Sequence, residues 1–200
     1  MMLPSNGHRA HGFSSELFLD SDEIIQELNL KGDETFMDAG CGDGHNAIKI
    51  LEDYNHKGIV YAVDVYDASI EDMEKYKKEN NIENLINIEA DITEGIPGVE
   101  DSSVDVILMV NVFHGFKASR RMDEAVEELF RIVKDDGKIA IMDYKAWDVP
   151  KGPPTPVRSS PQDLEKLFNN HGLKMTYLNE EIGEDIPEGK SHYLIMFEKD

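Results

Sequence analysis

The chain has little cysteine, few basic residues and no long apolar run. Cys41 is the only cysteine among 200 residues, which excludes an intrachain disulfide and a multi-thiolate metal site. The longest uncharged stretch, residues 106–116, is far shorter than the ~20 residues of a membrane helix. The N-terminus is polar and shows no apolar signal segment. We therefore expect a soluble, cytoplasmic protein without a membrane span and without a bound metal.

The shortage of basic residues also bears on the partners. Only 20 Lys and Arg residues oppose 41 Asp and Glu residues, so the formal net charge is -21. Such a charge repels phosphate backbones, so nucleic acid is not expected as a partner. Two reasons for the acidity stay open: solubility in a salty cytoplasm, or attraction of a cationic substrate.

Apolar patterning predicts one α/β domain over residues 21–200, preceded by a flexible N-terminal arm over residues 1–20. Strand patterns alternate with helix patterns, which implies a parallel sheet with right-handed crossovers. Ser21 is the expected cap of the first helix, and Asp67 that of a later one. The expected strands are residues 35–39, 59–63, 85–90, 104–110, 137–144, 173–178 and 191–197, the last two joined by an acidic loop. Two of the expected helices are residues 21–30 and 67–80. Three more are expected: one after Gly44, one whose apolar stripe runs from Met122 to Val133, and one that starts at Pro161.

Three glycines at alternate positions follow the first expected strand. Gly40, Gly42 and Gly44 stand between that strand and a helix pattern. Glycine lets a ligand lie against the backbone, and a helix start offers unpaired N–H groups, so this segment is predicted to hold polar groups of a cofactor. Cys41 lies inside the loop, either as a small residue that fills space or as a catalytic thiol.

The spacing of the loop separates two cofactor classes. A dinucleotide fingerprint needs a third glycine three positions after the second, where this chain has His45. Asp38 and Asp43 would also repel a pyrophosphate. A ligand that carries cations fits better, and S-adenosylmethionine (SAM), with its sulfonium and ammonium groups, is such a ligand.

The motif resembles that of the class I, Rossmann-like SAM-dependent methyltransferases. Their first motif is acid-x-Gly-x-Gly-x-Gly, and Asp38 with the three glycines matches every fixed position. The likeness covers about residues 33–145, and outside it the chain is most similar to small prokaryotic methyltransferases of the quinone-biosynthesis type. The resemblance implies a mostly parallel seven-stranded sheet with helices on both faces and a C-terminal antiparallel hairpin.

The resemblance also implies roles for residues at successive strand ends. Asp64, with Val65 beside it, corresponds to the acid that binds the ribose hydroxyls. Its distance in sequence from the glycine loop also suits the ribose-binding acid of a general Rossmann unit, which follows roughly 20 residues after the glycines. Asp91 corresponds to the residue that contacts the adenine amino group, with Ile92 beside the ring. The predicted cofactor-binding residues are Asp38, Gly40, Cys41, Gly42, Gly44, Asp64, Val65, Asp91, Ile92 and Asn111.

The acceptor is expected beside the segment that follows the fourth strand. His114 is the candidate general base and acceptor-binding residue; the alternative is that it packs on the cofactor or forms a hydrogen bond with a loop carbonyl. Asp143, Tyr144 and Lys145 follow the fifth strand and either orient an acceptor or are merely solvated. Arg9 and His11 either close over the cofactor or belong to a disordered chain end.

The sequence thus predicts an enzyme that transfers a methyl group from SAM to a small molecule by in-line displacement. Three alternatives stay open: a nicotinamide-dependent reductase, a SAM-binding sensor or partner subunit without catalysis, and a methyltransferase for protein side chains. A Tyr-x-x-x-Lys pair, which short-chain reductases use, is absent. The acceptor atom and the oligomeric state are not predicted.

Overall fold

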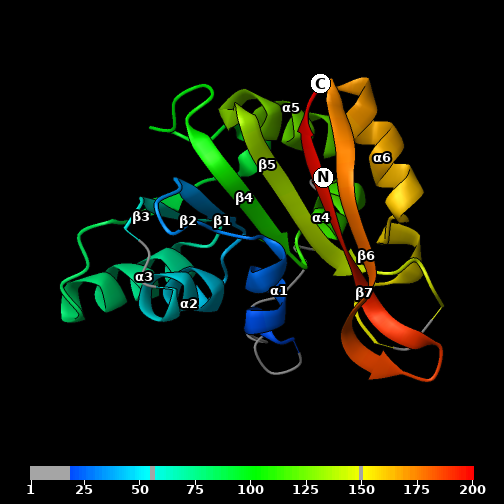
Figure 1. The fold of residues 1–200 in the computed structure, drawn as a ribbon, viewed down its shortest axis with the longest axis horizontal. Coiled ribbons are helices and arrows are strands. Elements are labelled where there is room, and N and C mark those ends of the chain that lie inside the picture. The colour runs from blue at the N-terminus through cyan, green and yellow to red at the C-terminus, as the bar shows by residue number, and fades with distance from the viewer. Residues whose placement is uncertain (1–18, 55–56, 149–150) are drawn as a thin grey trace, which may run out of the picture.

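The fold is a single seven-stranded sheet covered by helices on both faces (Figure 1). The computed structural model describes residues 19–54, 57–148 and 151–200. The strands are β1 (Phe36–Ala39), β2 (Val60–Asp64), β3 (Leu85–Glu89), β4 (Val104–Val110), β5 (Val133–Tyr144), β6 (Leu173–Ile186) and β7 (Gly189–Lys199). The helices are α1 (Ser21–Glu27), α2 (His45–Asp53), α3 (Asp67–Glu79), α4 (Phe113–Ser119), α5 (Met122–Ile132) and α6 (Pro161–Asn170), with short 3₁₀ turns at Ile92–Glu94 and Thr155–Val157.

The strand order is β3-β2-β1-β4-β5-β7-β6. The first five strands are parallel, and β7 pairs antiparallel with both β5 and β6. The predicted α/β fold with its C-terminal antiparallel hairpin is confirmed. The order of the strands reverses between β1 and β4, so the loops that follow these two strands diverge and leave a crevice at their carboxyl ends.

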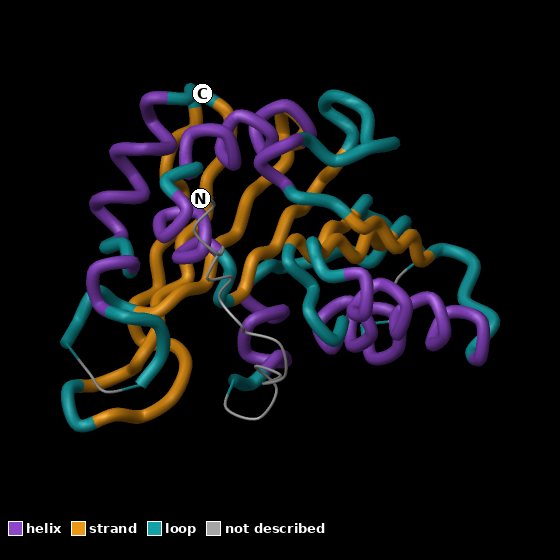
Figure 2. The backbone as a smooth tube through the Cα atoms, turned by 180° about the vertical axis from the view of Figure 1, so that it is seen from behind, coloured by secondary structure: helices purple, strands orange, loops and turns teal. Residues whose placement is uncertain are grey.

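Alternating side chains of the strands form two separate cores. Val106, Leu108 and Val110 of β4 pack with α1, α2 and α3, whereas Ile107 and Met109 pack with α4, α5 and α6. This period of two is what a strand buried on both faces produces. Figure 2 shows the sheet between the two groups of helices.

Three helix boundaries differ from the sequence-based expectation. Asp20, not Ser21, caps α1, because its carboxylate accepts the N–H groups of Asp22 and Glu23. In α3 the cap position is held by Tyr66, and Asp67 is the first helical residue. Helix α5 ends at Ile132, and β5 begins at Val133 without an intervening loop.

The expected acidic loop near the C-terminus is strand instead. Strands β6 and β7 stay paired out to Ile186 and Gly189, past the glutamates that suggested a loop. Register shifts after Met175, Asn179 and Ile182 accommodate the extra residues. The backbone pairing with β7 satisfies the polar backbone groups there, and Glu180, Glu181 and Asp185 are exposed along this edge strand, whereas Glu184 is half-buried and pairs with Lys151.

Candidate functional site

A cavity of about 1070 Å³ lies at the carboxyl ends of the parallel strands. The loops that follow β1, β2, β3 and β4 line it, together with the end of β5 and the segment around Pro153. Ten of the predicted site residues line this cavity: Gly40, Cys41, Gly42, Asp64, Val65, Asp91, Ile92, Asn111, His114 and Tyr144.

The glycine loop uses its backbone differently from the expectation. The N–H groups of Gly40 and Cys41 donate to the Val63 carbonyl oxygen, at 2.7 and 2.9 Å. The Gly42 N–H donates to Asp64 Oδ2 at 2.8 Å, and the Gly44 N–H donates to the Cys41 carbonyl oxygen. These four amides are therefore occupied within the protein and are not free to bind a ligand.

Two of the loop glycines are required for different reasons. A Cβ on Gly44 would lie 1.9 Å from Met73 Sδ, so a side chain there would have to displace the buried Met73 of α3. A Cβ on Gly42 would meet no protein atom within 4 Å, although Gly42 lines the cavity. The open space beside Gly42 is therefore room for a ligand.

Asp38 lies behind the loop and does not line the cavity. Its carboxylate is buried and accepts the Ala47 N–H at 3.2 Å, which joins β1 to the first turn of α2. Burial raises the pKa of Asp38 to about 7. Burial also raises the pKa of the Cys41 thiol, which keeps it protonated and favours the interpretation of Cys41 as a space-filling residue.

Acidic side chains collect at one end of the cavity. The Asp64 carboxylate accepts the N–H groups of Gly42 and Tyr66, at 2.8 and 3.0 Å. A carboxylate has about four acceptor positions, so Asp64 can accept two further hydroxyl groups. Asp91 accepts the N–H and the hydroxyl of Thr93, and Asp43 and Asp72 also line the cavity. This end suits a ligand that carries hydroxyl groups and a positive charge.

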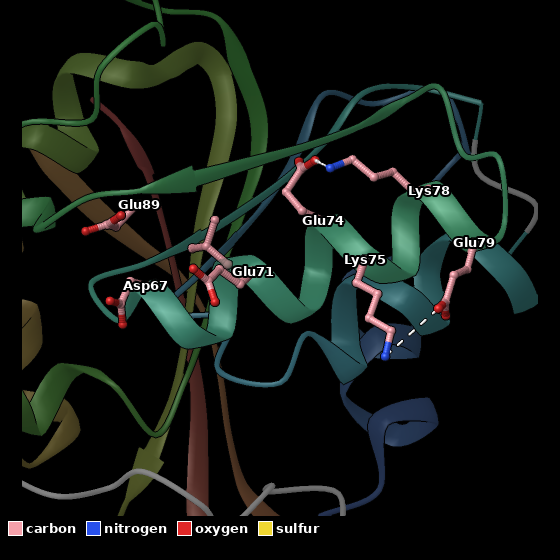
Figure 3. A pocket seen from close by; sticks show the side chains of 8 residues that line it. Asp67, Glu71, Glu74, Lys75, Lys78, Glu79 and Glu89 are labelled. Atoms are coloured by element: carbon pink, nitrogen blue, oxygen red, sulfur yellow. Dashed lines mark ion pairs between the residues drawn. The ribbon is translucent and has the colours of Figure 1, made fainter.

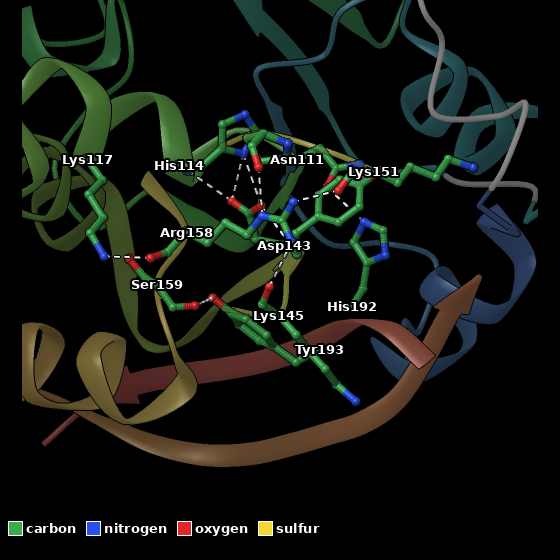
Figure 4. Close-up of polar contacts among 12 residues, drawn as sticks. Asn111, His114, Lys117, Asp143, Lys145, Lys151, Arg158, Ser159, His192 and Tyr193 are labelled. Carbon is green, nitrogen blue, oxygen red and sulfur yellow. Dashed lines mark hydrogen bonds and ion pairs between the residues drawn. The ribbon is translucent and has the colours of Figure 1, made fainter. Parts of the chain in front are cut away.

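His114 and Asp143 form a pair at the cavity wall (Figure 4). His114 Nδ1 lies 3.0 Å from Asp143 Oδ1, and the His114 backbone N–H donates to Asp143 Oδ2 at 2.9 Å. The Tyr144 N–H also donates to Asp143 Oδ1, at 2.7 Å. Asp143 is buried, so it holds the imidazole in one orientation and favours the tautomer that carries the proton on Nδ1.

Tyr144 and a proline-rich segment form the neighbouring wall. Gly152 approaches the Tyr144 ring so closely that a Cβ there would lie 2.6 Å from Cε1. The buried guanidinium of Arg158 lies 5.4 Å from the centre of the same ring and donates to the carbonyl oxygens of Pro153 and Trp147. Burial raises the pKa of Tyr144 to about 12, so its hydroxyl stays protonated at neutral pH.

Three predicted site residues that the structure describes, Lys145, Asp38 and Gly44, do not line this cavity. Lys145 is buried, and its ammonium lies 4.3 Å from the centre of the Trp147 ring. Asp38 and Gly44 support the loop from behind, as described above. Arg9 and His11, and the predicted arm up to residue 18, lie outside the described residues.

A second hollow, of about 570 Å³, runs along α3 and is separate from these residues (Figure 3). It is lined by charged side chains that pair along the helix, Lys75 with Glu79 and Lys78 with Glu74. None of the predicted site residues that the structure describes lines it. It has the character of a solvated helix surface.

A sequence profile of the family described as "Methyltransferase domain" matches residues 30–198. The chain belongs to this methyltransferase family. The prediction of a class I, SAM-dependent methyltransferase is confirmed, and the match extends well beyond the glycine motif to the C-terminal hairpin.

Individual relatives of this methyltransferase domain differ in their described activities. A tRNA(Thr) (cytosine(32)-N(3))-methyltransferase of Saccharomyces cerevisiae is 30% identical over 58% of the chain and 19% of its own length. A ubiquinone/menaquinone biosynthesis C-methyltransferase of Rhizobium rhizogenes is 26% identical over 64% of the chain and 49% of its own length. The chain spans between 19% and 51% of the length of the curated relatives that it matches.

Among solved structures, a SAM-dependent methyltransferase from Aquifex aeolicus superposes with a TM-score of 0.77. It is 24% identical, and the match covers 94% of this chain and 93% of that one. This likeness supports the fold over the whole domain. In the described residues, no helix is long and apolar enough to cross a membrane.

The structure adds two residues of this methyltransferase domain that sequence reasoning did not consider. His192, on β7, contacts Asn111 at the cavity wall, and Arg158 fixes the segment beside Tyr144. A histidine within the apolar run 191–197 was a signal for the first. No local pattern marked the second, because its hydrogen-bond partners are carbonyl oxygens of a loop.

Proposed function

We propose that this chain methylates a small, uncharged acceptor, and that His114 removes a proton from the attacking atom of that acceptor. The pair of His114 and Asp143 at the cavity wall is the observation that carries this proposal. Asp143 orients the imidazole through Nδ1, so Nε2 on the opposite side of the ring is the nitrogen that takes the proton. Tyr144 is no alternative base, because its hydroxyl stays protonated.

The cavity fits SAM in size and in the distribution of charge. The open space at Gly42 adjoins the acidic end, where Asp64 would accept the ribose hydroxyls and Asp91 the adenine amino group, with Val65 and Ile92 beside the base. The ammonium group of the methionyl part would be attracted by the same acids. SAM supplies an activated methyl group on a sulfonium.

The reaction then needs little beyond alignment and removal of one proton. A bond forms between the acceptor atom and the methyl carbon while the bond from that carbon to sulfur breaks, which releases a neutral thioether. The acceptor's proton moves to His114, and Asp143 stabilises the imidazolium that results. Val112, Phe116, Tyr144, Pro153 and Pro154 would enclose the acceptor and exclude water.

The chemistry of this wall favours a small, neutral acceptor with an ionisable O–H, N–H or S–H group. The side chains proposed to enclose the acceptor are apolar or aromatic, with His114, Ser119 and Arg121 as polar neighbours in the same cavity. The acids of the cavity come from the loops after β1 and β3, from the end of β2 and from α3. The net charge of -21 also disfavours polyanions.

The test uses methyl-labelled SAM and an extract separated into small molecules, protein and nucleic acid. Label should accumulate in the small-molecule fraction, and His114→Gln should lower the rate about 100-fold while S-adenosylhomocysteine still binds. His171→Gln is a matched control, because His171 pairs with Asp123 at 3.0 Å and does not line the cavity. Label in protein or nucleic acid would refute the acceptor class, and binding without any transfer would indicate a sensor.

A further inference from the structure

Because the amides of the glycine loop are occupied, another group must bind the carboxylate of the methionyl part of SAM. That group would lie near Asp43 and Asp64, which repel it, and the N–H groups of Gly40, Cys41, Gly42 and Gly44 already donate to protein oxygens. A carboxylate in this position needs a donor that is held toward it. This inference rests on the proposed function, because it concerns the same cofactor.

Asn111 stands where such a donor is needed. It follows the last residue of β4, and the next residue, Val112, packs directly against the glycine loop: a Cβ on Gly40 would lie 2.4 Å from Val112 Cγ2. Asn111 lines the cavity and has a left-handed backbone, with φ of 58°. Its backbone N–H donates to the Met142 carbonyl oxygen, which fixes the main chain.

His192 contacts the oxygen of the Asn111 side-chain amide (Figure 4). His192 is completely buried on β7, and its ring centre lies 4.0 Å from that of Tyr144. Its Nε2 lies 3.0 Å from Asn111 Oδ1. The Asn111 oxygen is thus directed toward β7, which leaves the Nδ2 donors for the cavity.

A chain of hydrogen bonds fixes the tautomer of His192. The Glu184 N–H donates to Ser191 Oγ at 3.0 Å, and Ser191 Oγ lies 2.6 Å from His192 Nδ1. Asn111 Oδ1 can only accept, so Nε2 carries the proton of the neutral ring and Nδ1 accepts the hydroxyl proton of Ser191. Burial lowers the pKa of His192 to about 4, so the ring is neutral at physiological pH and the pattern of donors persists.

We propose that His192 is a positioning residue that holds the Asn111 amide with its Nδ2 donors directed at the carboxylate of the methionyl part of SAM. The C-terminal hairpin thereby contributes to cofactor binding, although its strands follow the parallel part of the sheet. The carboxylate is the recognised group, so the affinity for a nucleoside without a carboxylate should not depend on His192.

The experiment compares two nucleosides by calorimetry. S-adenosylhomocysteine carries the methionyl carboxylate, whereas 5′-methylthioadenosine lacks the amino acid part. His192→Phe keeps a ring against Tyr144 but donates no hydrogen bond, so it should weaken S-adenosylhomocysteine at least tenfold and change methylthioadenosine less than twofold. His192→Gln, whose amide nitrogen can replace Nε2, should restore most of the affinity.

Asn111→Asp provides an independent arm in case the first variant fails to fold. The new carboxylate has the shape of the amide but repels the ligand carboxylate, so the same selective loss of S-adenosylhomocysteine binding is expected. Combining His192→Phe with Asn111→Asp should add little to either loss, because both act on one contact.

Three outcomes would overturn the inference: unchanged binding of S-adenosylhomocysteine by both variants, equal losses for both nucleosides, or additive losses in the double variant. Failure of the wild-type protein to bind S-adenosylhomocysteine would instead refute the proposed function itself. The two failures are therefore distinguishable in one set of titrations.

Discussion

Asp38 shows how a residue of a cofactor motif can serve the fold instead of the ligand. It matches the first acid of the motif, yet its carboxylate is buried behind the loop and bound to the Ala47 N–H. Its neighbours include Asp43 and Asp64, and burial with this negative charge favours the protonated form. Burial of the Asp38 carboxylate is electrostatically unfavourable, but its hydrogen bond to the Ala47 N–H fixes the junction between β1 and α2.

We predict that Asp38→Asn removes one pH-dependent part of the stability. The pKa of Asp38 is about 7 in the folded state and 3.8 in the unfolded chain, so the folded state binds the proton more tightly. The free energy of unfolding therefore falls as pH rises from about 4 to 7, and the loss is complete above that range. Asn cannot ionise but can still accept the Ala47 N–H. The variant should gain up to about 4 kcal/mol over wild type at pH 8.

Urea denaturation of both proteins at pH 5 and pH 8 measures this effect as a difference. His192 and other groups that do not interact with Asp38 contribute equally to both proteins, so their contributions cancel. The gain should grow from pH 5 to pH 8. A difference that stays the same at the two pH values would contradict the raised pKa of Asp38.

The pair of His114 and Asp143 marks the limit of prediction for single residues. The sequence indicated His114 as a site residue and left Asp143 as either an acceptor-orienting or a solvated residue, because each follows or ends a strand at the expected edge. It did not indicate that they contact each other, since 29 positions separate them and the contact depends on the register of β4 against β5. His192 depends in the same way on the pairing of β7 with β5.

At the scale of elements, different glycines of the loop between β1 and α2 serve packing and ligand binding. Gly44 is filled from behind by Met73 of α3, whereas Gly42 faces open space in the cavity. Both have positive φ, of 78° and 55°, so an alanine at either position carries a similar backbone cost. The two glycines therefore form a matched pair.

We predict opposite profiles for Gly44→Ala and Gly42→Ala. Gly44→Ala should lose about 2 to 4 kcal/mol of stability, because overpacking against Met73 adds to the backbone strain. Gly42→Ala should lose only about 1 kcal/mol but should weaken S-adenosylhomocysteine at least tenfold, since its methyl group occupies ligand space. Denaturation and calorimetry on both variants give the comparison. Wild-type affinity in Gly42→Ala would show that the ligand does not use that space.

Helices and strands with apolar periodicity were predictable from the sequence. Those whose conformation depends on contacts with distant segments of the chain were not. Strands β1 to β5 and helices α2, α3, α5 and α6 follow their hydrophobic patterns. The outer half of the C-terminal hairpin does not, because its residues are acidic and only pairing with the opposite strand makes them extended. Helix α4 is another such case: its start is fixed by the bond from the His114 N–H to Asp143.

At the scale of the whole molecule, the net charge bears on which acceptors can approach. A charge of -21 on 200 residues produces a repulsive field for any polyanion, independent of the geometry of the cavity. The similarity to a yeast tRNA methyltransferase instead suggests RNA as an acceptor, but the matched region is 19% of that protein. The two observations make different predictions about RNA.

We predict that this chain does not retain tRNA at about 0.15 M salt, because it lacks the excess of basic residues from which proteins gain counterion release. S-adenosylhomocysteine should bind under the same conditions, and its affinity should change little with salt, since the ligand has no net charge to screen. Filter binding of labelled tRNA over a range of salt concentrations, with calorimetry of the nucleoside in parallel, measures both. Retention of tRNA that weakens steeply with salt would reveal a local basic surface strong enough to overcome the net charge, and would move the acceptor from small molecules to RNA.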